Sequence, residues 1–140
     1  TYLNFDMAGI NYPAPFALNA FIGPDEDPEV VEQEDLVRLT NRTAHDILKY
    51  PRVSGVNVEE QSHRGSDHYR FEEIGVPIVF FYGLSASEYD AYHSPDDTLE
   101  EMERVAGGQD NLMAGFDTVA WMGFYLTVVL DNDDTVHQLF

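Results

Sequence analysis

Two separated stretches of this chain carry histidine and carboxylate side chains that could bind a metal. His93 belongs to AYHSPDDTLE, residues 91–100, and Asp6 belongs to YLNFDMAG near the beginning. The chain has no cysteine, which excludes disulfides and thiolate metal sites. Imidazole and carboxylate remain as the natural ligands for a metal that performs hydrolysis. Taken alone, each residue has a simpler explanation, because Asp6 could cap a turn and His93 could be an ordinary surface residue.

The strands expected around these residues place Asp6 near the end of one strand and His93 after the end of another. Alternating apolar residues predict a strand over residues 2–7, which contains Asp6, and a second over residues 16–22. The apolar run VPIVFFYG, residues 76–83, predicts a central strand buried on both faces, and His93 follows ten residues later. A short strand is also expected over residues 53–58. Loops at strand ends are where α/β folds bind ligands.

Four helices are expected between and after these strands, over residues 29–50, 66–75, 99–106 and 110–130. Asp27 would cap the first and Ser66 the second, while Thr98 and Glu101 form a capping box at the start of the third. Pro51 would end the first helix and Gly107 the third. Strands that alternate with helices predict an α/β fold, here as one domain over residues 1–140.

Composition limits the classes of partner. The chain has 140 residues, 44% of them hydrophobic, which is typical of one folded domain. The net charge of −19 excludes nucleic-acid binding through phosphate contacts and argues against anionic membrane surfaces. The longest apolar run, residues 118–130, predicts a buried helix because it is too short to cross a bilayer. The 26 acidic residues are scattered, which favours a salt-adapted, halophilic surface over an ordinary acidic protein.

Three motifs in order give a more specific indication. They are NFDMAG at residues 4–9, RGSDHYRFEEIGVPIVFF at residues 64–81 and DAYHSPDDT at residues 90–98. Together they resemble the M28 family of zinc aminopeptidases along nearly the whole chain. The resemblance implies a three-layer α/β/α fold with a mixed sheet, the zinc-exopeptidase (phosphorylase/hydrolase-like) fold, present in part. Glutaminyl cyclases share this fold and much of these motifs, and they are the alternative.

The resemblance also implies roles for particular residues. Asp6 and His93 would be ligands of two different metals in a pair of zinc ions, and the substrate would be a peptide. Tyr92 would donate a hydrogen bond to the developing oxyanion, although simple packing is the slightly favoured explanation of a tyrosine here. Asp97 would orient His93 or its neighbours.

Asp67 and His68 would lie near the pocket, behind the ligands or on the substrate side. The alternative for Asp67 is the first turn of a helix, where a carboxylate suits the helix dipole. A separate metal site made of His63 and His68 is a further alternative, although the resemblance places no ligand at either position.

One departure from the family limits these expectations. The family's first histidine, its bridging aspartate and its adjacent Glu-Glu pair precede the Asn-x-Asp-Met motif, whereas only three residues precede Asn4. The glutamate pairs at 59–60, 72–73 and 100–101 all follow the motif, so they are not the family's base and ligand. We therefore expect the C-terminal half of the peptidase domain, partnered by the N-terminal half of the same fold and inactive alone. A non-enzymatic module that kept the fold is the other alternative, and no compartment is predicted.

Overall fold

The computed structural model describes residues 1–10, 17–23, 32–60, 64–84 and 87–132. Its strands are β1 (Tyr2–Asp6), β2 (Ala17–Ile22), β3 (Gly55–Glu59) and β4 (Ile78–Tyr82). Its helices are α1 (Glu32–Ile47), α2 (His68–Glu72), α3 (Leu99–Ala106) and α4 (Gln109–Asn132). All the strands and helices expected from the sequence are present, with shifts at several ends.

The four strands form one mixed sheet in the order β1-β4-β2-β3. Strand β4 pairs parallel with β1 and antiparallel with β2, which in turn pairs parallel with β3. The first four residues of β4, Ile78 to Phe81, are all buried, as its continuous apolar sequence predicts for a central strand. Strand β1 lies at one edge of the sheet, so β1 and β4 run side by side in the same direction.

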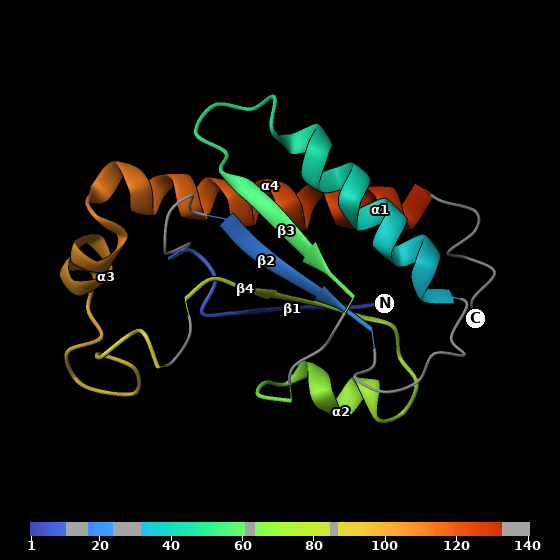
Figure 1. The fold of residues 1–140 in the computed structure, drawn as a ribbon, viewed down its shortest axis with the longest axis horizontal. Coiled ribbons are helices and arrows are strands. Elements are labelled where there is room, and N and C mark those ends of the chain that lie inside the picture. The colour runs from blue at the N-terminus through green and yellow to red at the C-terminus, as the bar shows by residue number, and fades with distance from the viewer. Residues whose placement is uncertain (11–16, 24–31, 61–63, 85–86, 133–140) are drawn as a thin grey trace.

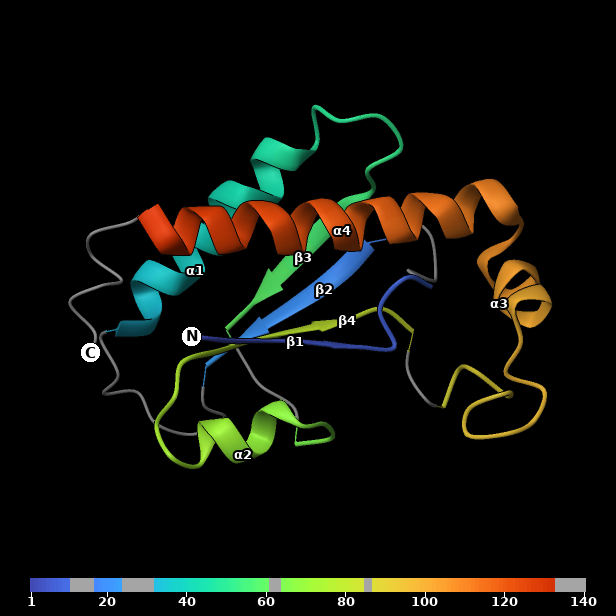
Figure 2. The ribbon, with the colours of Figure 1, turned by 180° about the vertical axis from the view of Figure 1, so that it is seen from behind.

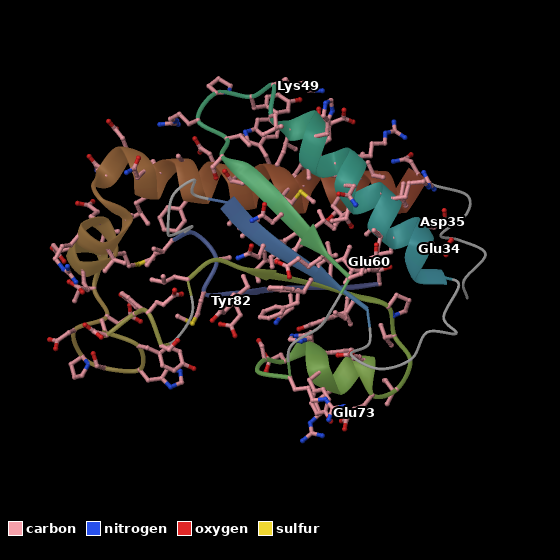
Figure 3. The ribbon with its side chains drawn as sticks, viewed as in Figure 1. Glu34, Asp35, Lys49, Glu60, Glu73 and Tyr82 are labelled. Carbon is pink, nitrogen blue, oxygen red and sulfur yellow. The ribbon has the colours of Figure 1, made fainter. Side chains whose placement is uncertain are left out.

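Helices cover both faces of the sheet, which makes three layers. Helices α1 and α4 cross one face, and α2 lies against the other face (Figure 1). The reverse view shows α3 beyond the end of the sheet toward which β1 and β4 run (Figure 2). Glu34, Asp35, Glu73 and the single lysine, Lys49, lie on the outside of these layers, away from the sheet (Figure 3). The observed architecture is the three-layer α/β/α arrangement with a mixed sheet that was expected.

Of the three buried hydrophobic clusters among the described residues, two join the sheet to α1, α4 and α3. The larger lies between the sheet and the α1–α4 layer and includes Leu18, Val79, Phe81 and Met122. The smaller lies at the end of β1 and β4, under α3, and includes Ile10, Leu84, Tyr89 and Leu112. Burial of apolar surface is the main stabilising term in both. The smaller cluster supports the turns that come after the two strands.

Helix α4 passes very close to the turn after β1. A Cβ atom built on Gly115 would lie 1.8 Å from the carbonyl oxygen of Gly9. Gly9 itself has a φ of +120°, in the region that favours glycine, and its position faces the ring of Phe116. Both glycines are therefore required by this close approach of helix to turn.

The long helix α4 differs in part from the prediction of a buried core helix. It extends over 24 residues and is long and apolar enough to cross a membrane by length and composition alone. Its inner face, which includes Leu112, Thr118 and Met122, is buried against the rest of the domain. Phe124, however, is 61% exposed, so the apolar run over residues 118–130 is buried on one side only, and the prediction of a buried helix was wrong for the other side.

The ends of α1 and α2 also differ from the sequence prediction. Helix α1 ends at Ile47 and is followed by a turn in which the Tyr50 amide donates to the Ile47 carbonyl, before Pro51. Its predicted start and cap lie outside the described residues. Helix α2 has only five residues, and its N-cap is Asp67 rather than Ser66. The hydroxyl of Ser66 instead accepts a hydrogen bond from the Asn4 side chain at 2.7 Å.

Candidate active site

The parallel pairing of β1 with β4 brings their two carboxyl ends together. Asp6, the last residue of β1, lies opposite Tyr82, the last residue of β4. The loop that carries His93 leaves the sheet just beyond Tyr82. Ligand sites in α/β proteins form at such carboxyl ends, because the loops that leave them can converge.

Asp6 and His93 line the same cavity, which has a volume of about 320 Å³. Its other lining residues are Met7, Ala8, Ile10, Leu84, Tyr89, Tyr92, Asp97 and Met102. The expected convergence of Asp6 and His93 at this edge of the sheet is therefore found. Asp97, from the same motif as His93, joins them.

Two residues of the cavity hold an unusual backbone conformation. Met7 has a φ of 49° and His93 a φ of 54°, both in the left-handed region that non-glycine residues rarely adopt. Such conformations cost free energy and persist where the surrounding structure enforces them, often at functional sites. At Met7 the chain turns directly after Asp6, and at His93 it turns at the residue expected to bind metal.

Hydrogen bonds between residues close in sequence shape residues 89–98, here called the His93 loop. The backbone amides of Tyr92 and Ser94 donate to the carbonyls of Tyr89 and Ala91, at 2.9 and 3.0 Å. The Ser94 hydroxyl also donates to the Ala91 carbonyl, at 2.9 Å. The loop is thus a series of tight turns with His93 between them.

The Tyr89 hydroxyl donates a 2.6 Å hydrogen bond to Oδ1 of Asp97. Burial raises the pKa of Tyr89 to about 12, and the hydrogen bond to the Asp97 carboxylate adds to that rise. The ring of Tyr89 is buried in the smaller core cluster. Tyr89 and Met7 were not among the residues predicted for the site; Met7 reaches the cavity because it follows Asp6 directly, and Tyr89 because the folded His93 loop brings it there.

Tyr92 stacks on His93, with ring centroids 3.8 Å apart. Its side chain is 41% exposed and lines the cavity. The ring is therefore packed on the histidine at the cavity and is not buried in the core.

Asp67 and His68 lie outside the lining of this cavity. Asp67 is exposed at the start of α2, where its side chain forms no capping hydrogen bond. His68 is fully buried, and its ring stacks on that of Phe80 with centroids 4.2 Å apart. Its Nδ1 atom lies 3.3 Å from Nδ2 of Asn4. His68 therefore joins α2 to β1 inside the protein and does not line the cavity.

The remaining alternatives involve residues away from the cavity. His63 lies outside the described residues, so its suggested pairing with His68 has no structural counterpart here. Glu73 is exposed at the end of α2 and pairs with Arg70 at 2.7 Å. That pairing holds the pKa of Glu73 below its usual range, mainly through the hydrogen bond from Arg70.

The cavity offers the types of donor atom that zinc prefers, but too few of them. Asp6, His93 and Asp97 offer carboxylate oxygen and imidazole nitrogen, which are the donors of hydrolytic zinc sites. Across the described ranges, however, no three His, Asp or Glu side chains gather closely enough to hold a metal ion. These residues therefore fit part of a zinc site.

Comparison with known families decides what this partial site belongs to. Residues 1–110 match the model of Peptidase family M28, which is more than three-quarters of the 140 residues. The chain belongs to peptidase family M28. Comparisons with curated proteins and with solved structures gave no match.

Membership of family M28 confirms the zinc-exopeptidase fold that the motifs indicated. It also assigns a peptidase type of function, since M28 is a family of metallopeptidases that generally depend on zinc. The match includes β1, β4, the His93 loop and α3, so every described residue of the cavity belongs to the family's part of this chain.

Proposed function

We propose that this M28 peptidase is a zinc-dependent aminopeptidase that releases N-terminal residues from peptides. One observation carries the proposal: Asp6 and His93, distant in sequence, line a single cavity at the carboxyl ends of β1 and β4. Each would hold one of two zinc ions. Zinc, when bound, polarises a substrate carbonyl and lowers the pKa of a bound water.

The charge around the cavity supports a preference for peptide amino termini. Residues 88–104 contain seven acidic side chains and one basic side chain, Arg104. Four of the acidic residues, with Arg104, line a second cavity of about 490 Å³ on the α3 side of the His93 loop. A negative potential there attracts a substrate ammonium group and disfavours a free substrate carboxylate.

Tyr92 is the proposed hydrogen-bond donor to the oxyanion. Its ring is stacked on His93 and is only partly covered, so its hydroxyl is free to reach a substrate beside the ligand. Preorganised donors of this kind stabilise charge that develops in the transition state. Asp67 is exposed at the start of α2 and does not line this cavity. Its proposed role is therefore an indirect one, outside the cavity.

We further propose that the other ligands and the general base come from the N-terminal half of the same fold, and that residues 1–140 alone are inactive. A catalytic zinc normally has three protein ligands, more than Asp6 and His93 supply between two metals. The sheet offers a place for that half, because β1 is an edge strand and Phe5, stacked on Phe81 at 4.6 Å, remains 42% exposed.

The test is aminopeptidase turnover by the full-length protein with zinc, on peptides with a free or an acetylated amino terminus. We expect cleavage of the free peptide only, loss with a chelator, and a fall in kcat/KM of at least about 10³-fold in Asp6→Asn and His93→Gln variants. His45→Gln, at an exposed histidine of α1 outside the cavity, is the matched control. Cyclisation of N-terminal glutamine without cleavage, or equal activity in the variants, would contradict the proposal.

A further inference from the structure

The two ends of the His93 loop are joined by one side-chain hydrogen bond. The Tyr89 hydroxyl donates to Asp97 Oδ1 at 2.6 Å, across eight residues of sequence. Tyr89 is 4% exposed and packs in the same cluster as Ile10 and Leu84, which follow β1 and β4. The bond therefore connects the far end of the loop to the core beneath the cavity.

His93 lies between these two anchored residues in a conformation that it would not adopt by itself. Its φ of 54° is left-handed, and its imidazole stacks on Tyr92, which is itself partly exposed. A left-handed histidine is retained only where other interactions enforce it. The turns on either side are local, since their hydrogen bonds span two or three residues.

The end of the loop after Asp97 is fixed by α3. Thr98 has an extended backbone, and its Oγ1 accepts a hydrogen bond from the Glu101 amide at 3.3 Å, which starts the helix. Asp97 thus precedes the fixed start of α3 and also accepts the hydrogen bond from Tyr89. Loss of the Tyr89 hydroxyl would free the loop between Ala91 and Thr98 while leaving α3 intact.

We propose that Tyr89 is a positioning residue for His93, which acts through Asp97 to hold the imidazole at the cavity before any ligand binds. The role itself is to keep the His93 loop ordered. Only its expected effect on metal binding rests on the proposed zinc function. An imidazole already in place loses less conformational freedom when it becomes a ligand, so its affinity for metal is higher.

Three variants separate this role from general stability. Tyr89→Phe keeps the buried ring and removes the hydroxyl, and Asp97→Ala removes the acceptor. Asp97→Asn keeps an acceptor oxygen and should preserve the bond to Tyr89. The matched control is Tyr125→Phe, which removes another tyrosine hydroxyl, one that is hydrogen-bonded to the Tyr50 hydroxyl between α1 and α4, away from the cavity.

The first measurement is backbone amide hydrogen exchange in the metal-free protein. We expect exchange of residues 90–97 to rise roughly tenfold in Tyr89→Phe and Asp97→Ala, because one hydrogen bond is lost. Asp97→Asn and Tyr125→Phe should leave this segment as in the native protein. The double variant Tyr89→Phe/Asp97→Ala should show no further rise. Unchanged exchange in Tyr89→Phe, or an equal rise throughout the protein, would overturn the positioning role.

The second measurement is a titration with Zn²⁺ by calorimetry, with His93→Gln as a reference that lacks the ligand. We expect Tyr89→Phe to weaken the binding that depends on His93 by about tenfold, and Tyr125→Phe to leave it unchanged. If native protein and His93→Gln bind Zn²⁺ alike, the proposed metal role fails, and hydrogen exchange still decides the positioning role. If Tyr89→Phe loosens the loop without weakening binding, Tyr89 does not position a ligand.

Discussion

The α1–α4 layer and the His93 loop are built in different ways. In the layer, Tyr50 stacks on Trp121 at 3.8 Å, and the Ser54 amide donates to Thr118 Oγ1 at 2.8 Å, between regular helices and the adjoining turn. The loop consists of turns with a left-handed residue at His93 and is held by its own hydrogen bonds. The layer stabilises the domain by burying apolar surface. Ordering the loop costs conformational entropy, and the ordered loop holds its side chains at the cavity.

This difference explains why the cavity lies where it does. Regular helices bury backbone polar groups in their own hydrogen bonds, and they leave few side chains free to converge. Loops beyond the ends of parallel strands can converge on one point while the sheet keeps their bases rigid. In this chain, β1 and β4 provide that base, and the smaller core cluster fills the space under it.

The largest effect is expected where α4 touches the turn that follows Asp6. In Gly115→Val, the new side chain would meet the Gly9 carbonyl oxygen, 1.8 Å from the Cβ position, so helix or turn must move. We expect a loss of more than about 4 kcal/mol in the free energy of unfolding, measured by urea denaturation.

The control for that substitution is Gly65→Val, because Gly65 has open space around its Cβ position. It should cost less than about 1 kcal/mol. Similar stability of Gly115→Val and the control would mean that α4 and the turn are not in contact, and the layer and the cavity region would then be independent.

Within the layer, two neighbouring residues of α4 should differ sharply. Met122 is fully buried and Phe124 is 61% exposed. Met122→Ala should cost about 3 kcal/mol, since it leaves a cavity in the larger core cluster, and Phe124→Ala less than about 1 kcal/mol. Equal losses in urea denaturation would show that Phe124 is covered in solution, for example by a second molecule.

Salt should affect the region of the His93 loop more than the layer. Residues 88–104 carry seven acidic side chains against one arginine, within a chain of net charge −19. The Debye length falls from about 30 Å at 0.01 M salt to about 3 Å at 1 M, which screens this repulsion. We expect the melting temperature to rise by on the order of 5–10 °C over that range in sodium chloride, as for a salt-adapted protein.

The regional part of this prediction is measured by hydrogen exchange at the two salt concentrations. Protection should increase more in residues 88–104 than in α4. A melting temperature that is flat or falls with salt would contradict a halophilic surface, and a uniform rise in protection would contradict the regional difference.

The smallest effect is expected from pH, at Tyr89. Its pKa in the folded protein is about 12, above the usual 10, so the neutral hydroxyl is favoured by folding. The stability contributed by this group should be complete below pH 10 and lost as the pH rises from 10 to 12. The difference in free energy of unfolding between native protein and Tyr89→Phe should therefore shrink over that interval.

Ultraviolet absorbance of tyrosinate gives an independent measurement. The native protein should show one tyrosine that titrates near pH 12 and that is missing in Tyr89→Phe. If the tyrosine that is missing in Tyr89→Phe titrates near pH 10 instead, the Tyr89 hydroxyl is open to solvent, and the His93 loop is less ordered than its hydrogen bonds indicate.

Local sequence patterns predicted most of the elements, for reasons that act over a few residues. The apolar run at residues 76–83 predicted the buried strand β4, and Thr98 with Glu101 predicted the start of α3. The cap of α2 was predicted one residue early, because the hydroxyl of Ser66 binds Asn4, 62 residues away, instead of the helix amides. Such a competing partner is not visible in a local pattern.

The sequence by itself determined the family, the two candidate ligands and the strands they follow. Those features depend on residue types, their order and short-range periodicity. Only the tertiary structure decided that β4 lies next to β1, so that Asp6 and His93 share a cavity, and that Tyr89 reaches Asp97. It also placed His68 in the interior and left Phe124 exposed. The physical reason is that strand pairing, burial and side-chain contacts depend on residues far apart in the chain, whose positions are set by the packing of the whole domain.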